Sequence, residues 1–268
     1  MLLRAVALLF ALTTVFARAP ALQAQTALAL TEAGKLTWGT SATFPPFESL
    51  RDGKPVGFDI DMVTAIAAKM HLQSAPSLID FKGLIPALLG GRIDAIVSGM
   101  YINPERSQVV NFIPYLRVGD QLLVANGNPL HLTALAELCG HRLAAAVGTV
   151  YEKQAQALAA DCQKDGKGAL TIISLTSTAV SALALKEGRA DALVASVPTV
   201  LALVKESPDA FATTGATFDN KTLLGIGFGK DNTALRDAVD AALKAIVADG
   251  TYASLIKKYD LPASSSLF

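Results

Sequence analysis

Short apolar runs alternate with amphipathic stretches along most of the chain. The runs Leu36 to Trp38 and Ile93 to Val97 are typical of buried strands. Asp59 to Met70 predicts a helix, because its apolar residues recur every three to four positions and share one face. Leu84 to Leu89 predicts a second, shorter helix. This alternation indicates an α/β fold.

Two segments nearly repeat each other. Residues 91–98 contain Gly-Arg-Ile-Asp-Ala and residues 188–196 contain Gly-Arg-Ala-Asp-Ala, and each predicts a glycine helix stop before a buried strand. A second echo links residues 36–40 with residues 144–149, where an apolar strand runs into Gly-Thr. We therefore expect the same α/β unit twice. Because ligands of open α/β sheets lie beyond the carboxyl ends of strands, the residues after these strands are expected to line one cleft.

Arg106 is the most specific candidate for ligand binding. It lies in the first turn of a predicted helix that Asn103 caps, where a cation opposes the helix dipole. A bound carboxylate would compensate, since a guanidinium can hold it through two parallel hydrogen bonds. The alternative is a surface arginine paired with Glu105 or with solvent.

Thr149 and Glu152 have the T-x-x-E spacing of a capping box at the start of a predicted helix. Free amides at a helix N-terminus also attract carboxylates, so the segment is either a plain cap or part of a binding site. Phe44, in a loop stiffened by prolines, and Phe81 are candidate walls of a small-ligand pocket. Lone phenylalanines are more often core residues, and the sequence leaves both readings open.

Composition and the N-terminus narrow the functional classes. The 268 residues include 23 Lys and Arg and 23 Asp and Glu, so the chain has no basic footprint for nucleic acid or anionic lipid. Residues 1–24 predict a cleaved signal peptide, with Arg4, an apolar run from Ala5 to Ala17 and a small-residue exit. The run is shorter than the roughly 20 residues that a spanning helix needs, so stable membrane insertion is not expected.

The only two cysteines, Cys139 and Cys162, both belong to the exported part and predict a structural disulfide. Two buried thiols are the alternative. The three histidines show no ligand spacing with the cysteines, so neither a metal nor another cofactor is predicted. No nucleophile motif or phosphate-cradling loop is present either, and binding fits the sequence better than catalysis.

Several short blocks recur in a specific order between residues 36 and 262. They are Phe44-Pro45-Pro46-Phe47-Glu48, Gly57-Phe58-Asp59-Ile60-Asp61, Leu84-Ile85-Pro86-Ala87-Leu88, Gly91-Arg92-Ile93-Asp94-Ala95, Ser98-Gly99-Met100, Glu105-Arg106, Pro114-Tyr115 and Gly148-Thr149. With these blocks the chain resembles the polar amino-acid-binding family of periplasmic solute-binding proteins.

The resemblance implies a two-lobed type II periplasmic-binding-protein fold, with two mixed sheets flanked by helices and joined by two hinge strands. Lobe one would comprise residues 31–119 and 224–268, and lobe two residues 120–223. The lobes would close on a small carboxylate-bearing solute, an amino acid or a related organic acid. The protein would act in the periplasm as a monomer that delivers its solute to an inner-membrane ABC permease.

The resemblance also assigns roles to single residues. The solute carboxylate would be held by Arg106, by the Ser98 and Gly99 segment, and by amides near Thr149 and Val150. Phe44 would pack on the body of the solute, and Phe81 stands where a second wall residue is expected.

The position of the acid that pairs with the solute ammonium departs from the family. That position here is Ser196, Ser41 replaces an acid found in binders of cationic ligands, and Tyr101 stands where many relatives have a small polar residue. A buried ammonium without a counter-charge costs several kcal/mol. The solute therefore lacks a charged amine, or another group such as Glu48 or Asp120 replaces the acid, or the protein binds differently from its relatives.

Two other functions remain open at this stage. Cyclohexadienyl dehydratases resemble the same family, and Glu152 would be the general acid of such an enzyme. A sensory module, whose liganded lobes contact a receptor, is the other alternative. We expect a binding protein and not an enzyme.

Overall fold

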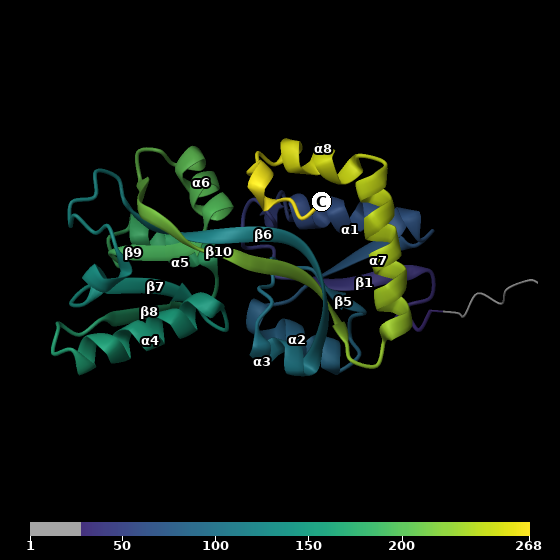
Figure 1. Ribbon diagram of the computed structural model, residues 1–268, viewed down its shortest axis with the longest axis horizontal. Coiled ribbons are helices and arrows are strands. Elements are labelled where there is room, and N and C mark those ends of the chain that lie inside the picture. The colour runs from purple at the N-terminus through teal and green to yellow at the C-terminus, as the bar shows by residue number, and fades with distance from the viewer. Residues whose placement is uncertain (1–27) are drawn as a thin grey trace, which may run out of the picture.

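The computed structural model describes residues 28–268, which form two lobes joined by two long strands (Figure 1). The predicted signal peptide, residues 1–24, lies outside the described residues. The strands are β1 (Lys35–Thr40), β2 (Ser49–Arg51), β3 (Lys54–Val56), β4 (Gln73–Leu78), β5 (Ala95–Ile96), β6 (Val110–Ala125), β7 (Arg142–Ala146), β8 (Thr171–Leu175), β9 (Ala192–Ser196) and β10 (Phe211–Gly229).

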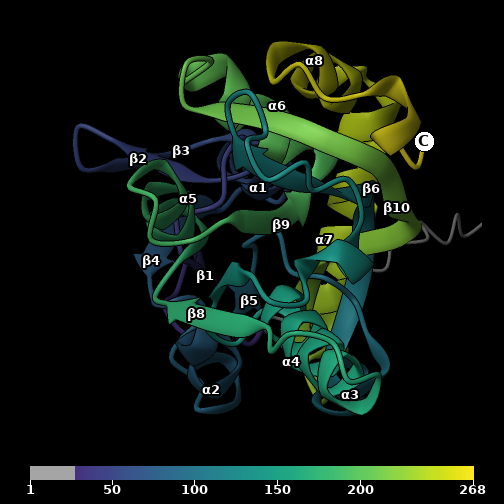
Figure 2. The ribbon, with the colours of Figure 1, turned by 90° about the vertical axis from the view of Figure 1, so that its left-hand side faces the viewer.

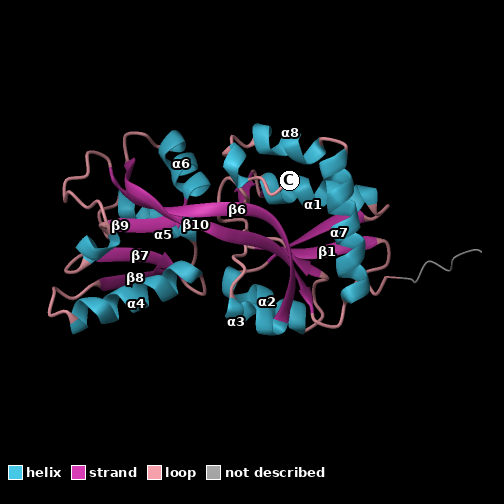
Figure 3. Ribbon diagram, viewed as in Figure 1, coloured by secondary structure: helices cyan, strands magenta, loops and turns pink. Residues whose placement is uncertain are grey.

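Helices cover both faces of the strands in each lobe (Figure 3). They are α1 (Phe58–Lys69), α2 (Leu84–Leu89), α3 (Pro104–Val109), α4 (Val150–Lys164), α5 (Thr178–Lys186), α6 (Val197–Glu206), α7 (Thr233–Ala248) and α8 (Thr251–Lys258). The described residues also contain three short 3-10 turns: η1 (Phe81–Gly83), η2 (Leu135–Leu138) and η3 (Ala263–Ser265). None of the helices in the described part is long and apolar enough to span a membrane.

The two halves of the sheet are continuous through the long strands. The strand order is β4-β1-β5-β10-β6-β9-β7-β8, and β2 and β3 form a separate hairpin. Parallel strands β4, β1 and β5 belong to lobe one, parallel strands β8, β7 and β9 to lobe two, and antiparallel β6 and β10 pass through both. Figure 2 views the molecule from the lobe-two end, with β8 in front. Because β6 and β10 are uninterrupted, the lobe boundaries expected at residues 119 and 224 stay a prediction.

The predicted elements correspond closely to the observed ones. Helix α1 begins at Phe58, one residue before the expected start, and α2 has the expected bounds. The expected strand Ile93 to Val97 is paired only over Ala95–Ile96, which is parallel to β1 and antiparallel to β10. The apolar positions that defined these elements form the core, since Trp38, Met62 and Ile66 are fully buried.

The predicted disulfide is present. Cys139, just after η2, is bonded to Cys162 in α4, and their Cα atoms lie 5.5 Å apart. The bond therefore ties α4, whose first turn faces the other lobe, to the body of lobe two. A crosslink of this kind stabilises a fold chiefly by restricting the unfolded chain.

Candidate functional site

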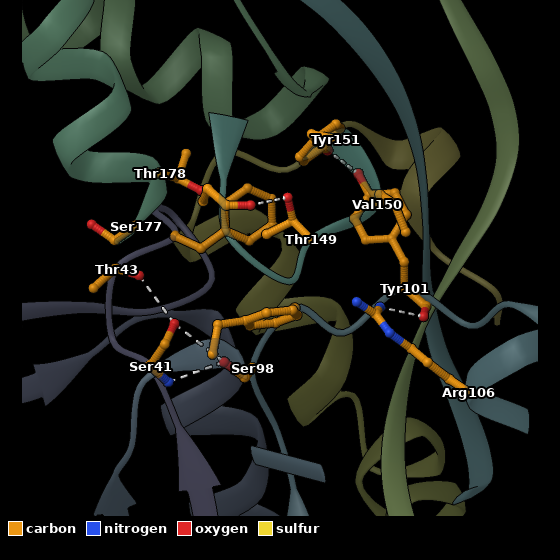
Figure 4. Close-up of a pocket in the computed structure, with 14 residues that line it drawn as sticks. Ser41, Thr43, Ser98, Tyr101, Arg106, Thr149, Val150, Tyr151, Ser177 and Thr178 are labelled. Atoms are coloured by element: carbon orange, nitrogen blue, oxygen red, sulfur yellow. Dashed lines mark hydrogen bonds between the residues drawn. The ribbon is translucent and has the colours of Figure 1, made fainter. Parts of the chain in front are cut away.

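A cavity lies between the lobes, and both lobes contribute side chains to its wall (Figure 4). Its lining residues are Ser41, Thr43, Phe44, Phe81, Ser98, Gly99, Tyr101, Arg106, Ala146, Thr149, Val150, Tyr151, Ser177 and Thr178. All the ligand-binding residues predicted from the sequence are among them except Ser196. The carboxyl ends of β1, β5 and β7 reach this cavity, as expected for ligand sites of α/β sheets.

Arg106 is held at the cavity by its own helix and by the other lobe. Asn103 caps α3 by accepting a hydrogen bond from the Arg106 amide at 2.8 Å, as predicted. The guanidinium donates through Nη1 to the Tyr101 carbonyl at 2.8 Å and through Nη2 to the Gly148 carbonyl at 3.1 Å. It also stands over the Phe81 ring, 5.3 Å from the centroid. These contacts fix the guanidinium without neutralising it.

No carboxylate in the described part of the chain forms an ion pair with Arg106. Glu105, the partner considered from the sequence, instead pairs with Lys153 of lobe two. Arg106 is only 9% exposed, and burial lowers its pKa to about 10. Because a buried guanidinium remains charged at neutral pH, the cavity contains an uncompensated cation that favours an anionic group.

A network of hydroxyl groups orients the serines at the cavity wall. Ser41 and Ser98 both donate to Oε1 of Glu48, at 2.6 and 2.7 Å, and Thr40 donates to Oε2. The Ser98 hydroxyl also accepts from the Ser41 amide at 3.0 Å. Burial raises the pKa of Glu48, which does not itself line the cavity. Glu48 thus positions the two hydroxyls from behind.

Gly99 is required by the backbone and by its neighbour Phe44. Its φ is +50°, and a Cβ at this position would lie 2.6 Å from Cδ1 of Phe44. Its amide donates to Oδ2 of Asp59 at 2.7 Å, and Tyr115 donates to the other oxygen of that carboxyl. Burial raises the pKa of Asp59 to about 8. Gly99 therefore lines the cavity, but its amide is already bonded to Asp59.

The first turn of α4 supplies the facing wall. Thr149 caps the helix by accepting from the Glu152 amide at 3.3 Å, and its hydroxyl donates to the Ala146 carbonyl. Glu152 accepts from the Gly148 amide at 2.8 Å and not from Thr149, so the expected capping box is displaced by one residue. Glu152 is not among the lining residues, and its carboxylate instead bonds to the backbone just before α4.

The sequence interpretation missed a second helix start at the cavity. Ser177 caps α5 by accepting from the Val180 amide at 3.2 Å, and both Ser177 and Thr178 line the cavity. The available signal was the polar run Thr176, Ser177 and Thr178 between β8 and an apolar helical stretch, which is typical of a cap. Tyr151, Ser41, Thr43 and Ala146 were also absent from the predicted set.

Ser196 is buried at the end of β9 and does not line the cavity. Its hydroxyl lies 2.8 Å from that of Thr199 and caps α6. Its neighbour across the sheet is Asp120 in β6. Oδ1 of Asp120 accepts from the hydroxyls of Tyr101, at 2.7 Å, and Tyr151, at 3.0 Å. Burial raises the pKa of this carboxyl to about 6.

Comparison with known proteins identifies the family from nearly the whole described chain. The family model for bacterial extracellular solute-binding proteins, family 3, matches residues 36–262. The chain belongs to this family. It is therefore placed among binding proteins and not among enzymes, and the predicted two-lobed fold is confirmed.

Several related proteins are named for the amino acid that they bind. The chain is 34% identical over 224 residues to ABC transporter arginine-binding protein 1 of Escherichia coli K12, covering 82% of this chain and 88% of that protein. It is 31% identical to a probable histidine-binding protein of Campylobacter jejuni, covering 83% and 84%. An Escherichia coli L-cystine-binding protein is 27% identical, covering 85% and 83%.

Solved structures agree with these relatives. An ancestral arginine-binding protein bound to arginine has a TM-score of 0.78 and 34% identity, covering 84% of this chain and 98% of that one. An ancestral arginine-binding protein bound to glutamine has a TM-score of 0.77 and 34% identity, covering 85% of this chain and 98% of that one.

Proposed function

We propose that this protein is the periplasmic substrate-binding component of an ABC importer and that it binds a small amino acid or related organic acid by its carboxylate. The solute occupies the cavity between the lobes, and its carboxylate bonds to Arg106. The amino-acid names of the relatives support the solute class, and the family supports an inner-membrane permease as partner.

The uncompensated charge of Arg106 carries the proposal. The guanidinium is buried and stacked on Phe81, and within residues 28–268 it is bonded only to the main-chain carbonyls of Tyr101 and Gly148. A carboxylate that accepts two parallel hydrogen bonds from it gains a charge-assisted contact that neither carbonyl provides. The hydroxyl of Ser98 and the first turn of α4 extend the same anion-binding region.

Closure of the lobes follows from contacts that cross the cavity. Arg106 of lobe one donates to the Gly148 carbonyl, and Glu105 pairs with Lys153 of α4. A solute that bonds to both lobes shifts the population toward the closed form, which is the form a permease would recognise. Thr149 and Val150 are the lobe-two residues expected to contact the carboxylate.

The test is a thermal-shift and calorimetric titration of the mature protein against the common L-amino acids and amine-free organic acids. A solute that binds only the folded state raises the melting temperature. Replacing Arg106 with alanine is expected to weaken the best solute by about 100-fold or more, because truncating one partner of a buried charge pair costs roughly 2–5 kcal/mol.

The matched control is Arg92→Ala, which removes an exposed arginine from the same lobe. This variant should bind the solute within about twofold of the wild type, because surface substitutions change free energies by about 0.5 kcal/mol or less. Unchanged affinity in Arg106→Ala, with the protein folded, would overturn the proposed carboxylate site.

A further inference from the structure

The cavity wall contains one charged side chain among its described residues, and it is a cation. Arg106 is positive, and no aspartate or glutamate is among the lining residues. Ser41 lines the wall, and Ser196 is buried outside it. In an α-amino acid bound at Arg106 the ammonium is attached to the carbon next to the carboxylate. It must therefore lie close to Arg106 and needs a nearby negative group to offset its desolvation.

Two buried carboxylates lie directly behind lining residues, and their surroundings differ. Glu48 already accepts three hydroxyl hydrogen bonds, which occupy both of its oxygens. Asp120 is 1% exposed and accepts two hydrogen bonds on Oδ1, from Tyr101 and Tyr151, while no hydrogen bond to Oδ2 is present in the described part. Asp120 is thus the less saturated of the two acids.

The three groups form a small cluster whose protons can be counted. The two tyrosine hydroxyls lie 2.5 Å apart, and each is within hydrogen-bonding distance of Asp120. When Asp120 is ionised, one hydroxyl donates to Oδ1 and the other donates to its neighbouring tyrosine oxygen, which leaves lone pairs free on the tyrosine oxygens. An ammonium in the cavity can then donate to a tyrosine oxygen, with the carboxylate charge one hydrogen bond behind it.

We propose that Asp120, acting through the hydroxyls of Tyr101 and Tyr151, supplies the counter-charge for the solute ammonium, so that the solute is an α-amino acid. This inference rests on the proposed carboxylate site at Arg106. The group of Tyr101, Tyr151 and Asp120 is called the tyrosine–aspartate cluster below.

The position of the cluster supports this role. Tyr101 accepts a hydrogen bond from Arg106 on its main-chain oxygen and donates another to Asp120 from its hydroxyl, so one residue connects the two ends of the site. Asp120 is the cross-strand neighbour of Ser196. Directly opposed residues of antiparallel strands lie about 5 Å apart at their Cα atoms. A carboxylate is therefore present on β6, directly opposite Ser196. The hydroxyls of Tyr101 and Tyr151 connect this carboxylate to the cavity.

The experiment compares two solutes that differ only in the amine. Calorimetry is run with the L-amino acid that most stabilises the wild type and with the 2-hydroxy acid that has the same side chain. Replacing Asp120 with asparagine should lower the affinity for the amino acid by about 30-fold or more, as expected when one member of a buried charge pair is lost. The hydroxy acid should change by less than about threefold, because it has no ammonium.

Two further variants keep the result interpretable. Asp219→Asn removes an exposed carboxylate of β10 that accepts a hydrogen bond from Gln154 and is not bonded to either tyrosine, and this variant should bind both solutes as the wild type does. If Asp120→Asn does not fold, Tyr151→Phe takes its place, and it should weaken the amino acid by about fivefold or more through the loss of one hydrogen bond.

Equal weakening of the two solutes, or no weakening of the amino acid, in the folded Asp120→Asn or Tyr151→Phe protein overturns the inference. A wild-type protein that binds only amine-free acids overturns it as well, while leaving the carboxylate site intact. Failure of the carboxylate site is recognised separately, because Arg106→Ala would then bind both solutes normally.

Discussion

The two lobes contain nearly the same sequence unit and use its start in the same way. In lobe one, Asp94 accepts from the Thr31 amide, the Thr31 hydroxyl and the Thr37 amide. In lobe two, Asp191 accepts from the Arg142 amide and side chain. Each aspartate thus anchors the central parallel strand of its lobe, β1 or β7, to the next strand. These contacts give both aspartates a structural role.

The ends of the two units differ. Ser98 follows β5 and leads into Gly99 with φ +50°, which turns the chain along the cavity wall. Ser196 ends β9 and leads into Val197 and Pro198, where α6 begins at once. One serine hydroxyl lines the cavity, and the other is used to cap a helix. Repetition of a unit therefore predicts the backbone of both lobes, whereas the residues after the unit decide which lobe supplies a ligand group.

The largest expected effect is a difference in stability between variants of the two aspartates. Asp94→Ala should lower the free energy of unfolding by about 3 kcal/mol, because it removes a buried carboxylate that accepts three hydrogen bonds, from the Thr31 amide and hydroxyl and from the Thr37 amide. Asp191→Ala should cost about 1–2 kcal/mol, since the Arg142 side chain is exposed enough to bond to water. Urea unfolding of both variants measures the difference. An equal loss in the two proteins would contradict the view that the lobe-one anchor is the more buried.

A smaller effect concerns the pH dependence of solute affinity, which we expect to follow the ionisation of Asp120. Burial raises the pKa of Asp120 to about 6, and a bound ammonium favours the ionised carboxylate and so lowers that pKa. Affinity for an amino acid should therefore be full above pH 6 and fall by up to about tenfold per pH unit below it, since protonated Asp120 must first lose its proton.

The groups around Asp120 define the control for this pH dependence. Tyr101 and Tyr151 have pKa values raised well above the ordinary value and stay protonated, and Asp219 of β10 is the other charged neighbour. Asp219→Asn should keep a pH dependence that moves slightly to lower pH, because the Asp219 charge raises the pKa of Asp120, and Asp120→Asn should flatten the profile. A profile that persists in Asp120→Asn, measured by calorimetry between pH 5 and 8, assigns the titration to another group.

The smallest expected effect separates the two serines. Ser98→Ala should weaken the solute by about fivefold, because a hydrogen bond contributes about 1 kcal/mol. Ser196→Ala should leave affinity within about twofold and lower the free energy of unfolding by about 1 kcal/mol through loss of the α6 cap. Parallel titration and urea unfolding distinguish the two outcomes, and a larger loss of binding in Ser196→Ala would place that residue at the solute after all.

Several features of the site could be predicted from local sequence. The Asn103 cap, the position of Arg106 in the first turn of the capped helix and the Thr149 cap depend on residues within a few positions of each other. The strand and helix pattern likewise identified the core around Trp38 and Met62. Local propensity and hydrophobic periodicity are sufficient for these features, because the interactions that fix them are short in sequence.

Other features depend on distances that no local pattern encodes. Tyr101 and Tyr151 come from different lobes, 50 residues apart, and their hydroxyls meet each other and Asp120 of β6 only in the folded chain. The hydrogen bond from the Gly99 amide to Asp59 also joins residues that lie far apart in sequence, 40 positions from each other. Ser196 was placed in the site by analogy with its family position, and only the packing of α6 shows that its hydroxyl is a helix cap.

The irregular pairing of the two long strands has a consequence for engineering. Strand β10 shifts register against β6 between Thr214 and Phe218, between Phe218 and Thr222, and between Leu224 and Gly225. Such irregularities loosen the ladder and let paired strands bend. If the lobes close on the solute as proposed, substitutions at these positions would shift the balance of open and closed forms and so scale the affinity for every solute by one common factor. Sensitivity and selectivity could thus be adjusted independently, the first at the strands and the second at the cavity wall.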